Sequence, residues 1–419
     1  MNIINADRLW QDVMELATYT ESGQPWTRRS FSKLYNEGRD WLIRKMEAAG
    51  LEIEVDAAAN IIGRRAGQNP SLPPIVIGSH TDTVQDGGRF DGISGVLVGL
   101  EVLRTLNEKG IILEYPIELV DFTAEEPSEY GLSTVGSRAW SGNLTEDMLS
   151  YTNKAGETLA EAIRRSGGNP KEIHTIQRKA DTIALYLELH IEQGPVLLKK
   201  QSSLGVVSGI VGIQRYHVTV EGLPNHAGTT PMNMRNDALN GACEMSLQLE
   251  RIANETYDAP VVGTVGEFNN FPNGSNVVPG RVTFSVEVRS ISSNVIDKVC
   301  EHFITQANAI SNRRGLKVTI ESISRSTPIV VQDQIKLMLR ESCEKVTNPV
   351  IELPSGAGHD ANQISLIGPV GMLFIPCRDG RSHCPEEWAE KEDLALGATA
   401  ILNMVQSFSK TILEGGLIK

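Results

Sequence analysis

The chain has 419 residues, of which 40% are hydrophobic and 22% are charged, and its formal net charge at pH 7 is −13. This length exceeds what one ordinary hydrophobic core accommodates, so we expect a globular protein with two domains. The acidic balance argues against nucleic-acid binding, because no basic patch is available to replace phosphate counterions. The first 16 residues contain no continuous apolar segment, and no apolar run reaches membrane-spanning length. Five scattered cysteines without CxxC spacing are typical of a reducing cytoplasm, so we expect a cytoplasmic protein that does not bind membranes.

The first half of the chain alternates helical patterns with short apolar segments. Residues 29–50 carry apolar side chains at helical intervals before Gly50, and residues 92–110 also predict a helix that ends at a glycine. Residues 73–80 and 116–122 are nearly continuous apolar runs, as in strands buried on both faces. We therefore expect an α/β domain with a mixed, mostly parallel sheet flanked by helices.

The pattern changes near residue 209. Residues 215–222 and 280–290 alternate strictly between apolar and polar side chains, which predicts an antiparallel sheet with one buried face. Helical patterns over residues 236–254 and 293–312 lie between these strands, so we expect a small α+β layer with helices on one face.

After about residue 325 the first pattern returns. A segment late in the chain must then rejoin the sheet formed by the first half. We therefore expect a catalytic domain of residues 1–208 and 325–419, interrupted by a smaller α+β lid domain of residues 209–324. No internal repeat or low-complexity segment is evident.

Five possible metal ligands stand where an apolar segment stops and a glycine-rich or polar turn begins. They are His80 in GSHTDTV, Asp91 in GGRFDG, Glu126 in FTAEEPS, His190 in ELHIEQG and His383 in GRSHCPEEW. Side chains at strand ends are exposed yet held by a rigid sheet. A mixture of imidazoles and carboxylates suits Zn, Mn or Co. Taken singly, each residue is more often an ordinary polar loop residue, so the prediction depends on their combination.

Carboxylates next to two of these candidates in the sequence strengthen this interpretation. Asp82 follows His80 by two residues, so in an extended segment both side chains leave on the same face. We expect Asp82 to accept the second ring N–H of His80, the usual support of a metal-bound imidazole. Glu125 and Glu126 are adjacent, which allows one to bind metal while the other handles protons. The alternative for this pair is a solvated acidic turn.

The order HTD, FDG, AEE, HIEQG and SHCPEEW resembles the M20-type metallohydrolases. Within them, the chain is similar to the branch of N-carbamoyl-L-amino acid hydrolases, allantoate amidohydrolases and yeast-type β-ureidopropionases. The resemblance covers nearly the whole chain and includes NHAGTTPM, NVVPGRVTFSVEVR and SGAGHDA. It implies a catalytic domain of the zinc-aminopeptidase type and an inserted lid domain that also serves dimerisation. PSEYGLSTVGSRAW, FNNFPNGS and Cys384 depart from the best-known carbamoylases, which leaves the substrate open.

The resemblance also implies the metal-binding roles. Two divalent ions, Zn, Mn or Co, would be bound, with Asp91 as the shared ligand. His80 and His190 would complete one metal, and Glu126 and His383 would complete the other. A shared anionic ligand is needed because two cations a few ångströms apart repel each other.

Catalytic and substrate-binding roles follow from the same resemblance. Glu125 would take a proton from water and deliver it to the leaving nitrogen, and His226 would donate to the attacked carbonyl oxygen. Arg289 lies on the polar face of its strand and would bind a substrate carboxylate, an exposed surface arginine being the alternative. His359 is either a further donor or a loop histidine that stabilises a glycine-rich turn. The remaining substrate-binding candidates are Gln193, Asn276 and Gly358.

Together these features predict hydrolysis of the carbamoyl C–N bond of a small N-carbamoyl-L-amino acid or related ureido acid. The substrate would carry a carboxylate, and the active site would be shared across a homodimer, with His226 acting on the neighbour's metals. Allantoate amidohydrolysis is the first alternative, followed by N-acyl amino acid deacylation or dipeptide hydrolysis. From a different class, the protein could be a non-catalytic small-ligand binder. Glu125 argues against a binder, because binding alone needs no base.

Overall fold

The computed structural model describes residues 4–411, which divide into two compact domains. The large domain contains the described residues up to Ser208 and from Val331 onward, and the inserted domain is Gly209–Val330. The second boundary lies later than the expected position between residues 324 and 325. Strand β13 (Lys317–Ser326) of the inserted domain continues past that position, and Ile329 and Val330 then pair with Ile210 and Gly209 at the start of the same domain.

The large domain is an α/β structure whose elements come from both ends of the chain. Its first part contains α1 (Ala6–Ala17), α2 (Lys33–Ala48), β1 (Glu52–Val55), β2 (Ile61–Arg65), β3 (Ile75–His80), α3 (Ile93–Glu108), β4 (Ile117–Phe122), α4 (Val135–Ser141), α5 (Glu146–Leu149), α6 (Leu159–Arg165), η1 (Pro170–Thr175), β5 (Leu185–Ile191), α7 (Val196–Lys199) and β6 (Leu204–Ile210). Its second part contains α10 (Asp333–Glu344), β15 (Val350–Ser355), α11 (Ala361–Ile364), β16 (Val370–Ile375), η3 (Arg378–Gly380) and α12 (Lys391–Thr411).

One mixed sheet organises this domain. Its strand order is β1-β2-β4-β3-β5-β16-β6-β14, with β15 paired to β6. The central strands β4, β3, β5 and β16 are parallel, whereas β1, β2, β6 and β14 (Ile329–Val330) pair antiparallel with their neighbours. The predicted fold class is therefore confirmed, and the late segment rejoins the first sheet through β16. Because the central strands are parallel, their carboxyl ends meet at one edge of the sheet, where ligands of α/β proteins bind.

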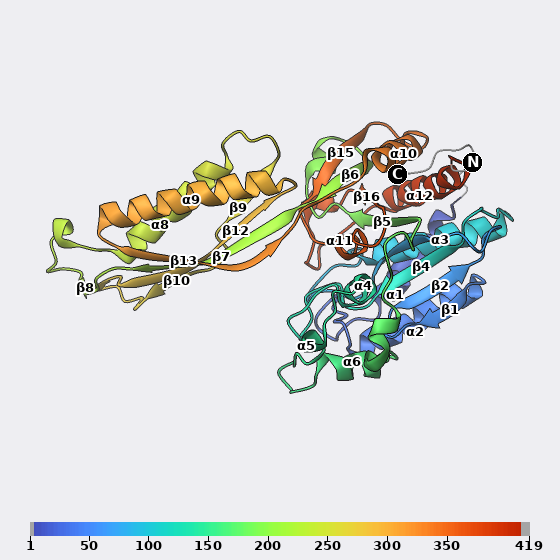
Figure 1. Ribbon diagram of the computed structural model, residues 1–419, viewed down its shortest axis with the longest axis horizontal. Coiled ribbons are helices and arrows are strands. Elements are labelled where there is room, and N and C mark those ends of the chain that lie inside the picture. Colours follow the sequence, from blue (N-terminus) through green and yellow to red (C-terminus); the bar gives the residue numbers. More distant parts are fainter. Residues whose placement is uncertain (1–3, 412–419) are drawn as a thin grey trace. The chain divides into compact units, whose positions relative to one another are not determined.

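Helices cover both faces of the central strands, which explains their continuous apolar sequences (Figure 1). On one face α3 and α12 approach closely: the backbone of Gly99 packs against Leu119, and that of Gly397 against Leu189. On the other face Trp140 of α4 packs edge-on against Phe122 at 5.1 Å between ring centroids. No helix in the described part of the chain combines the length and apolar character needed to cross a bilayer.

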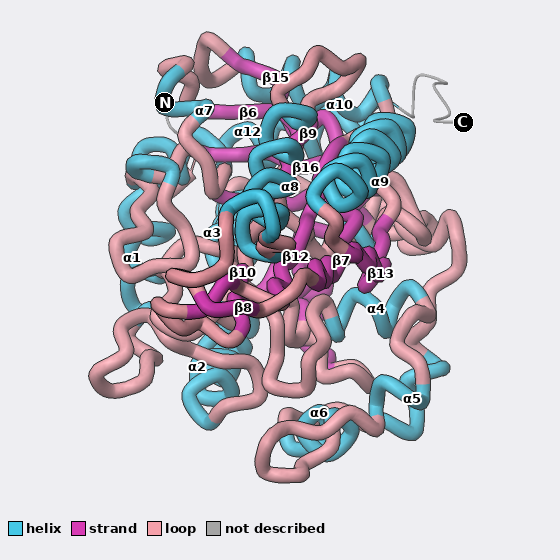
Figure 2. Tube along the Cα trace, turned by 90° about the vertical axis from the view of Figure 1, so that its left-hand side faces the viewer, coloured by secondary structure: helices cyan, strands magenta, loops and turns pink. Residues whose placement is uncertain are grey.

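The inserted domain is an antiparallel α+β layer. Its elements are β7 (Gly212–Glu221), β8 (Asn225–His226), η2 (Met232–Met234), α8 (Ala238–Ala253), β9 (Val261–Thr264), β10 (Phe268–Phe271), β11 (Val277–Val278), β12 (Arg281–Ser290), α9 (Ser293–Arg314) and β13. The short strand β14 falls in the same residue range but pairs with β6 in the sheet described above. The main sheet has the order β10-β12-β7-β13, with β9 added to β12, and β8 pairs with β11 separately. Helices α8 and α9 lie side by side against one face of this sheet (Figures 1 and 2).

The alternating pattern of β12 is confirmed by its burial. The apolar side chains face α8 and α9 and are buried, while the polar side chains between them remain partly exposed. The buried set is Val282, Phe284, Val286 and Val288.

Candidate metal centre

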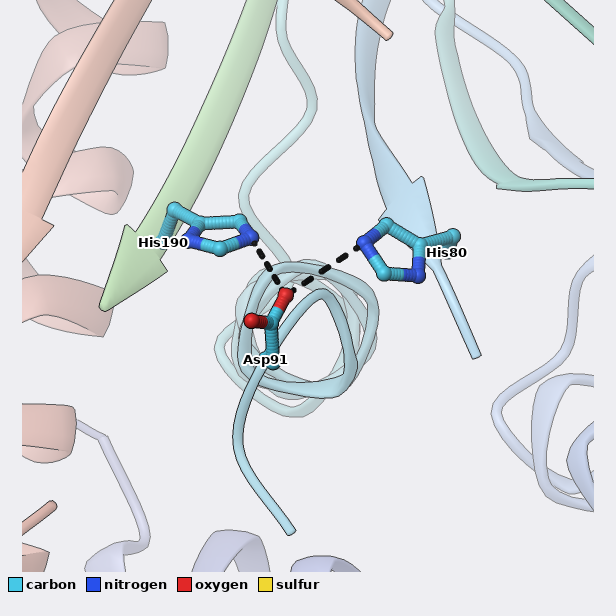
Figure 3. Close-up of side chains that lie close together, drawn as sticks. All are labelled: His80, Asp91 and His190. Atoms are coloured by element: carbon cyan, nitrogen blue, oxygen red, sulfur yellow. Dashed lines mark ion pairs between the residues drawn. The ribbon is translucent and has the colours of Figure 1, made fainter. Parts of the chain in front are cut away.

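Asp91 lies between two histidines at the carboxyl edge of the parallel strands (Figure 3). His80 is the last residue of β3, His190 belongs to the end of β5, and Asp91 stands just before α3. The Nε2 atoms of His190 and His80 are 3.1 Å and 3.7 Å from Asp91 Oδ1. The three side chains are buried and form a group that could hold a metal ion.

A second group uses the other oxygen of the same carboxylate. His383 Nε2 is 3.2 Å from Asp91 Oδ2 and 3.2 Å from Glu126 Oε1. Asp91, Glu126 and His383 also place their ligand atoms within 4.8 Å of one another. The structure therefore brings all five predicted metal ligands together, with Asp91 common to both groups.

Gly92 makes this close packing possible. Its backbone φ is +67°, and a Cβ atom at this position would lie only 2.3 Å from the His80 ring. Any side chain here would displace the imidazole, so the glycine of FDG has a steric reason. The Gly92 N–H also donates to His190 Nε2 at 3.2 Å.

The two buried histidines of the first group have their outer nitrogens occupied. His80 Nδ1 contacts the carbonyl oxygen of Asp82 at 3.1 Å, and His190 Nδ1 contacts that of Ile191 at 2.8 Å. A carbonyl only accepts hydrogen bonds, so each Nδ1 carries a proton. Nε2 is then the nitrogen left to bind a cation, and in both rings it faces Asp91.

The expected role of Asp82 is only partly correct. Its carboxylate lies 3.5 Å from His80 Nδ1, yet the hydrogen-bonding partner of that nitrogen is the Asp82 backbone carbonyl. The two carboxylate oxygens instead accept the backbone N–H groups of Glu125 and Glu126, each at 3.2 Å. Asp82 therefore connects the turn after β3 with the turn that carries the two glutamates through hydrogen bonds.

Glu125 lies beside the first group without belonging to it. Its Oε2 is 3.5 Å from His80 Nε2, and the side chain is almost completely buried. Burial raises the pKa of Glu125 well above its usual value, with His80 opposing the shift. The carboxylate is therefore disposed to hold a proton close to the ligand cluster.

The charges of the cluster fit divalent cations. Hydrogen bonds to Asp91 and Glu126 raise the pKa of His383 to about 11. Burial opposes protonation of His80, yet Glu125, Asp82 and Asp91 still raise its pKa well above the usual value. Buried carboxylates in excess of nearby cations create this demand for positive charge. The imidazole and carboxylate donors match Zn, Mn or Co.

Gln193 adjoins the second group. Its Nε2 donates to Asp91 Oδ2 at 2.6 Å and lies 3.3 Å from His383 Nε2, while its Oε1 is buried without a hydrogen-bond partner. Both Gln193 and His383 have left-handed backbones, with φ of +56° and +55°. Such conformations are rare outside glycine and concentrate at functional sites.

The GAGHDA segment contributes a buried and an exposed residue. His359 is buried, pairs with Ser355 Oγ at 2.7 Å and packs edge-on against His190 at 4.5 Å between ring centroids. This pairing across the glycine-rich turn corresponds to the stabilising alternative for His359. Gly358 is exposed in the same turn.

Three predicted substrate residues, His226, Asn276 and Arg289, lie in the inserted domain. His226 and Asn276 are exposed and neighbouring: Val277 is paired with His226, and the carbonyl of Asn276 accepts the N–H of Ala227 at 2.9 Å. His226 Nδ1 accepts the N–H groups of Gly228 and Thr229, so the ring proton is on Nε2.

Arg289 is paired rather than simply exposed. It lies on the polar face of β12, and its Nε donates to Glu287 Oε1 at 2.6 Å. Arg215 binds the other oxygen of Glu287, also at 2.6 Å. Two guanidinium groups thus share one carboxylate.

The sequence prediction missed Glu387, a buried carboxylate beside Asp91. Its Oε1 accepts the N–H groups of Phe90 and Asp91 at 2.8 Å and 3.1 Å. Burial and the charge of Asp91 raise its pKa to about 7. The available signal was its position four residues after His383 within SHCPEEW, but Glu386 next to it is exposed and nothing local separates the two.

Similarity to known proteins shows the family of the chain. A family model described as Peptidase family M20/M25/M40 matches residues 76–407. The chain is 38% identical over 405 residues to an N-carbamoyl-L-amino acid amidohydrolase of Geobacillus stearothermophilus, covering 96% of this chain and 98% of the relative. It is 34% identical over 391 residues to an allantoate deiminase of Arabidopsis thaliana, covering 86% and 74%. The solved structure of a hydantoinase/carbamoylase family amidase from Burkholderia multivorans is 36% identical, with a TM-score of 0.91 over 97% of this chain and 98% of that chain.

Proposed function

Since the chain belongs to peptidase family M20/M25/M40, we propose that it is a metal-dependent amidohydrolase acting on a small N-carbamoyl-L-amino acid or related ureido acid. The carbamoyl C–N bonds are cleaved with one water, and ammonia, carbon dioxide and the amino acid are released. The observation that carries the proposal is the double ligand group around Asp91 in a chain 38% identical to an N-carbamoyl-L-amino acid amidohydrolase. The chain acts in the cytoplasm.

Two divalent cations, Zn, Mn or Co, are the cofactors in this proposal. His80 and His190 would hold one, Glu126 and His383 the other, and Asp91 would be shared because its two oxygens face the two groups. When bound, such cations polarise a carbonyl and make water a nucleophile near neutral pH.

Glu125 is the general base of the proposed reaction. It lies within the cluster but outside both ligand groups, so its carboxylate stays available for protons. It takes the proton of the attacking water and passes it to the leaving nitrogen. Burial favours its protonated form after the first transfer.

Arg289 binds the substrate carboxylate. A guanidinium matches a carboxylate with two parallel hydrogen bonds. Arg215 beside it also binds Glu287, so two guanidinium groups lie close together at this position. Gln193 and the exposed Gly358 complete the substrate contacts on the large domain, and His359 stabilises the turn that carries Gly358.

His226 acts as a donor rather than as a base. Its Nδ1 is occupied by two backbone N–H groups, so the exposed Nε2–H is available for the oxygen of the attacked carbonyl. Asn276, which directly precedes β11 and accepts the N–H of Ala227, supplies a second polar contact.

These donors come from the second subunit of a homodimer. Along β12, eight residues separate Arg281, near the β8–β11 pair, from Arg289, which is roughly 26 Å in an extended strand. A small ureido acid cannot span this distance within one inserted domain. In a two-fold dimer, His226 and Asn276 of the partner subunit serve the site that uses the first subunit's Arg289.

A turnover screen of metal-loaded protein tests the proposal. The substrates are N-carbamoyl-L-amino acids, N-carbamoyl-β-alanine, allantoate, ureidoglycolate and N-acetyl amino acids, with ammonia and free amine measured separately. The expected result is equal release of ammonia and amino acid from an N-carbamoyl-L-amino acid, absent from the Glu125→Gln protein. Turnover confined to allantoate would favour the first alternative, and turnover confined to N-acetyl amino acids the deacylase. Ligand binding without turnover of any compound would identify a binding protein.

A further inference from the structure

Glu387 is a fully buried carboxylate that touches Asp91 without belonging to either ligand group. It comes from the loop after His383, whereas Asp91 precedes α3 in the first half of the chain. One oxygen, Oε1, accepts the backbone N–H groups of Phe90 and Asp91. A carboxylate that accepts several hydrogen bonds holds its donors in one geometry, because losing it would leave them buried and unpaired.

Ser382 extends this contact to the side chain of Asp91. The Ser382 hydroxyl lies 2.7 Å from Glu387 Oε2 and 2.8 Å from Asp91 Oδ2. Glu387 therefore contacts Asp91 in two ways. It binds the Asp91 backbone N–H directly, and it is linked to the Asp91 carboxylate through the Ser382 hydroxyl. Rotation of the Asp91 carboxylate would break the second contact. Such rotation would also turn Oδ1 away from His80 and His190.

Gly88 shows that space is reserved for this carboxylate. A Cβ atom at Gly88 would lie 1.9 Å from both Cδ and Oε1 of Glu387. The next residue, Arg89, stacks between Trp26 and Trp388 at 4.4 Å and 4.6 Å from the ring centroids. The loop before Asp91 and the loop after His383 are thereby held against each other, with Glu387 between them.

We propose that Glu387 is a positioning residue that orients Asp91 as the ligand shared by two cations, with Ser382 as its link to the carboxylate. It acts on cation affinity and contacts no substrate. The inference rests on the proposed function, since only a dinuclear centre needs both oxygens of Asp91 held in fixed directions.

The first test measures cation affinity by titrating metal-free protein with Mn²⁺ or Zn²⁺. Glu387→Ala should weaken binding by about 10–100-fold, the usual effect of removing a group that orients a ligand. Glu387→Gln should retain most of the affinity, because its amide oxygen still accepts both N–H groups and its NH₂ donates to Ser382. Glu386→Gln is the matched control. This neighbouring carboxylate is exposed and pairs with Arg381, and its loss should leave affinity unchanged.

Gly88 provides an independent variant with Glu387 intact. Gly88→Ala should weaken cation binding as Glu387→Ala does, because the new methyl group displaces the carboxylate. The double variant Gly88→Ala/Glu387→Ala should bind no more weakly than Glu387→Ala alone, since the clashing atoms are gone. Ser382→Ala, at a partly exposed position, should also weaken binding. It keeps the test decisive even where a buried substitution prevents folding.

Unchanged cation affinity in folded Ser382→Ala and Glu387→Ala, accompanied only by a lower Tm, would overturn the inference. Independent, additive losses in the Gly88→Ala/Glu387→Ala protein would overturn it as well. The titration does not use turnover. If wild-type protein binds two cations but hydrolyses no ureido acid, the proposed function fails while a loss of affinity in Glu387→Ala still supports the role of Glu387.

Discussion

His226 and Arg289 lie toward opposite ends of the inserted domain, His226 in the separate β8–β11 pair and Arg289 near the end of β12. The β8 segment that carries His226 follows the end of β7, where Glu221 pairs with Arg281 at the start of β12. Arg289 lies near the other end of β12, opposite Ile213. Both residues are predicted to act on one small substrate, so the separation within one chain has a direct consequence for the oligomeric state.

We expect two inactive variants to restore each other when their subunits exchange. His226→Ala protein mixed with Glu125→Gln protein should regain activity. If His226 acts across the interface, each heterodimer has one site with both lesions and one site with neither. With random exchange of equal amounts, about a quarter of all sites should become intact, and ammonia release measures them.

Two further mixtures control this experiment. His226→Ala with Asn276→Ala should stay inactive, because both residues come from the same partner and no heterodimer site is intact. Glu125→Gln with Arg289→Ala should stay inactive for the equivalent reason within one subunit. Continued inactivity of the His226→Ala and Glu125→Gln mixture, despite demonstrated exchange, would show that His226 serves its own subunit.

Arg289→Ala should depress kcat/KM for carboxylate substrates by orders of magnitude. Removing one partner of a desolvated charge pair costs about 2–5 kcal/mol. Amide analogues of the same substrates should lose much less. Arg215→Ala is the matched control, since it also removes one guanidinium charge that is paired with Glu287. Equal losses for acid and amide substrates would argue against Arg289 as the carboxylate reader.

Glu125→Gln should keep both cations and lower turnover by about 10²–10⁴-fold, the usual contribution of a positioned general base. Glu126→Gln, its neighbour, should instead lower cation occupancy, because Glu126 belongs to the second ligand group. Metal analysis alongside steady-state kinetics distinguishes the two effects. Full activity of metal-replete Glu125→Gln protein would exclude it as the base.

Asp82→Ala should weaken cation binding by roughly 10–100-fold although no ligand is removed. Its carboxylate accepts the N–H groups of Glu125 and Glu126, so its loss frees the turn that places both glutamates. Asp82→Asn should be intermediate, because the amide NH₂ cannot accept a hydrogen bond. Calorimetric metal titration measures the change. Wild-type cation affinity in the Asp82→Ala protein would show that Asp82 maintains only the backbone of the turn and does not support cation binding.

Removal of cations by a chelator should abolish turnover and lower the Tm, and Mn, Co or Zn should restore both. A cation that binds only the folded state adds about 2.7 kcal/mol of stability at a concentration 100 times its Kd. Without it, the buried carboxylates of Asp91 and Glu126 lose the positive charge of the cation. The Tm difference should shrink in Glu126→Gln. Turnover that survives complete chelation would contradict the metal-dependent reaction.

Much of the architecture follows from local sequence patterns. Continuous apolar runs mark strands buried on both faces, and strict alternation marks the one-sided sheet of the inserted domain, since side chains leave a strand on alternate faces. The candidate ligands could be selected from the sequence because each stands where such a run stops. His80 and His190 end parallel strands that lie side by side, so their meeting follows from the sheet once its strands are recognised.

Which atoms face one another depends on how distant parts of the chain pack together. The two oxygens of Asp91 face different ligand groups. The Asp82 carboxylate accepts hydrogen bonds from the turn of the two glutamates and not from the His80 ring. Glu387, and not its neighbour Glu386, contacts Asp91. These outcomes depend on loops that meet from distant parts of the chain and on differences of a few tenths of an ångström in hydrogen-bond geometry. The separation of His226 from Arg289 depends on the pairing of β7 with β12. Local periodicity predicts that a strand exists, but its partner and register are set by long-range packing, which no short stretch of sequence contains.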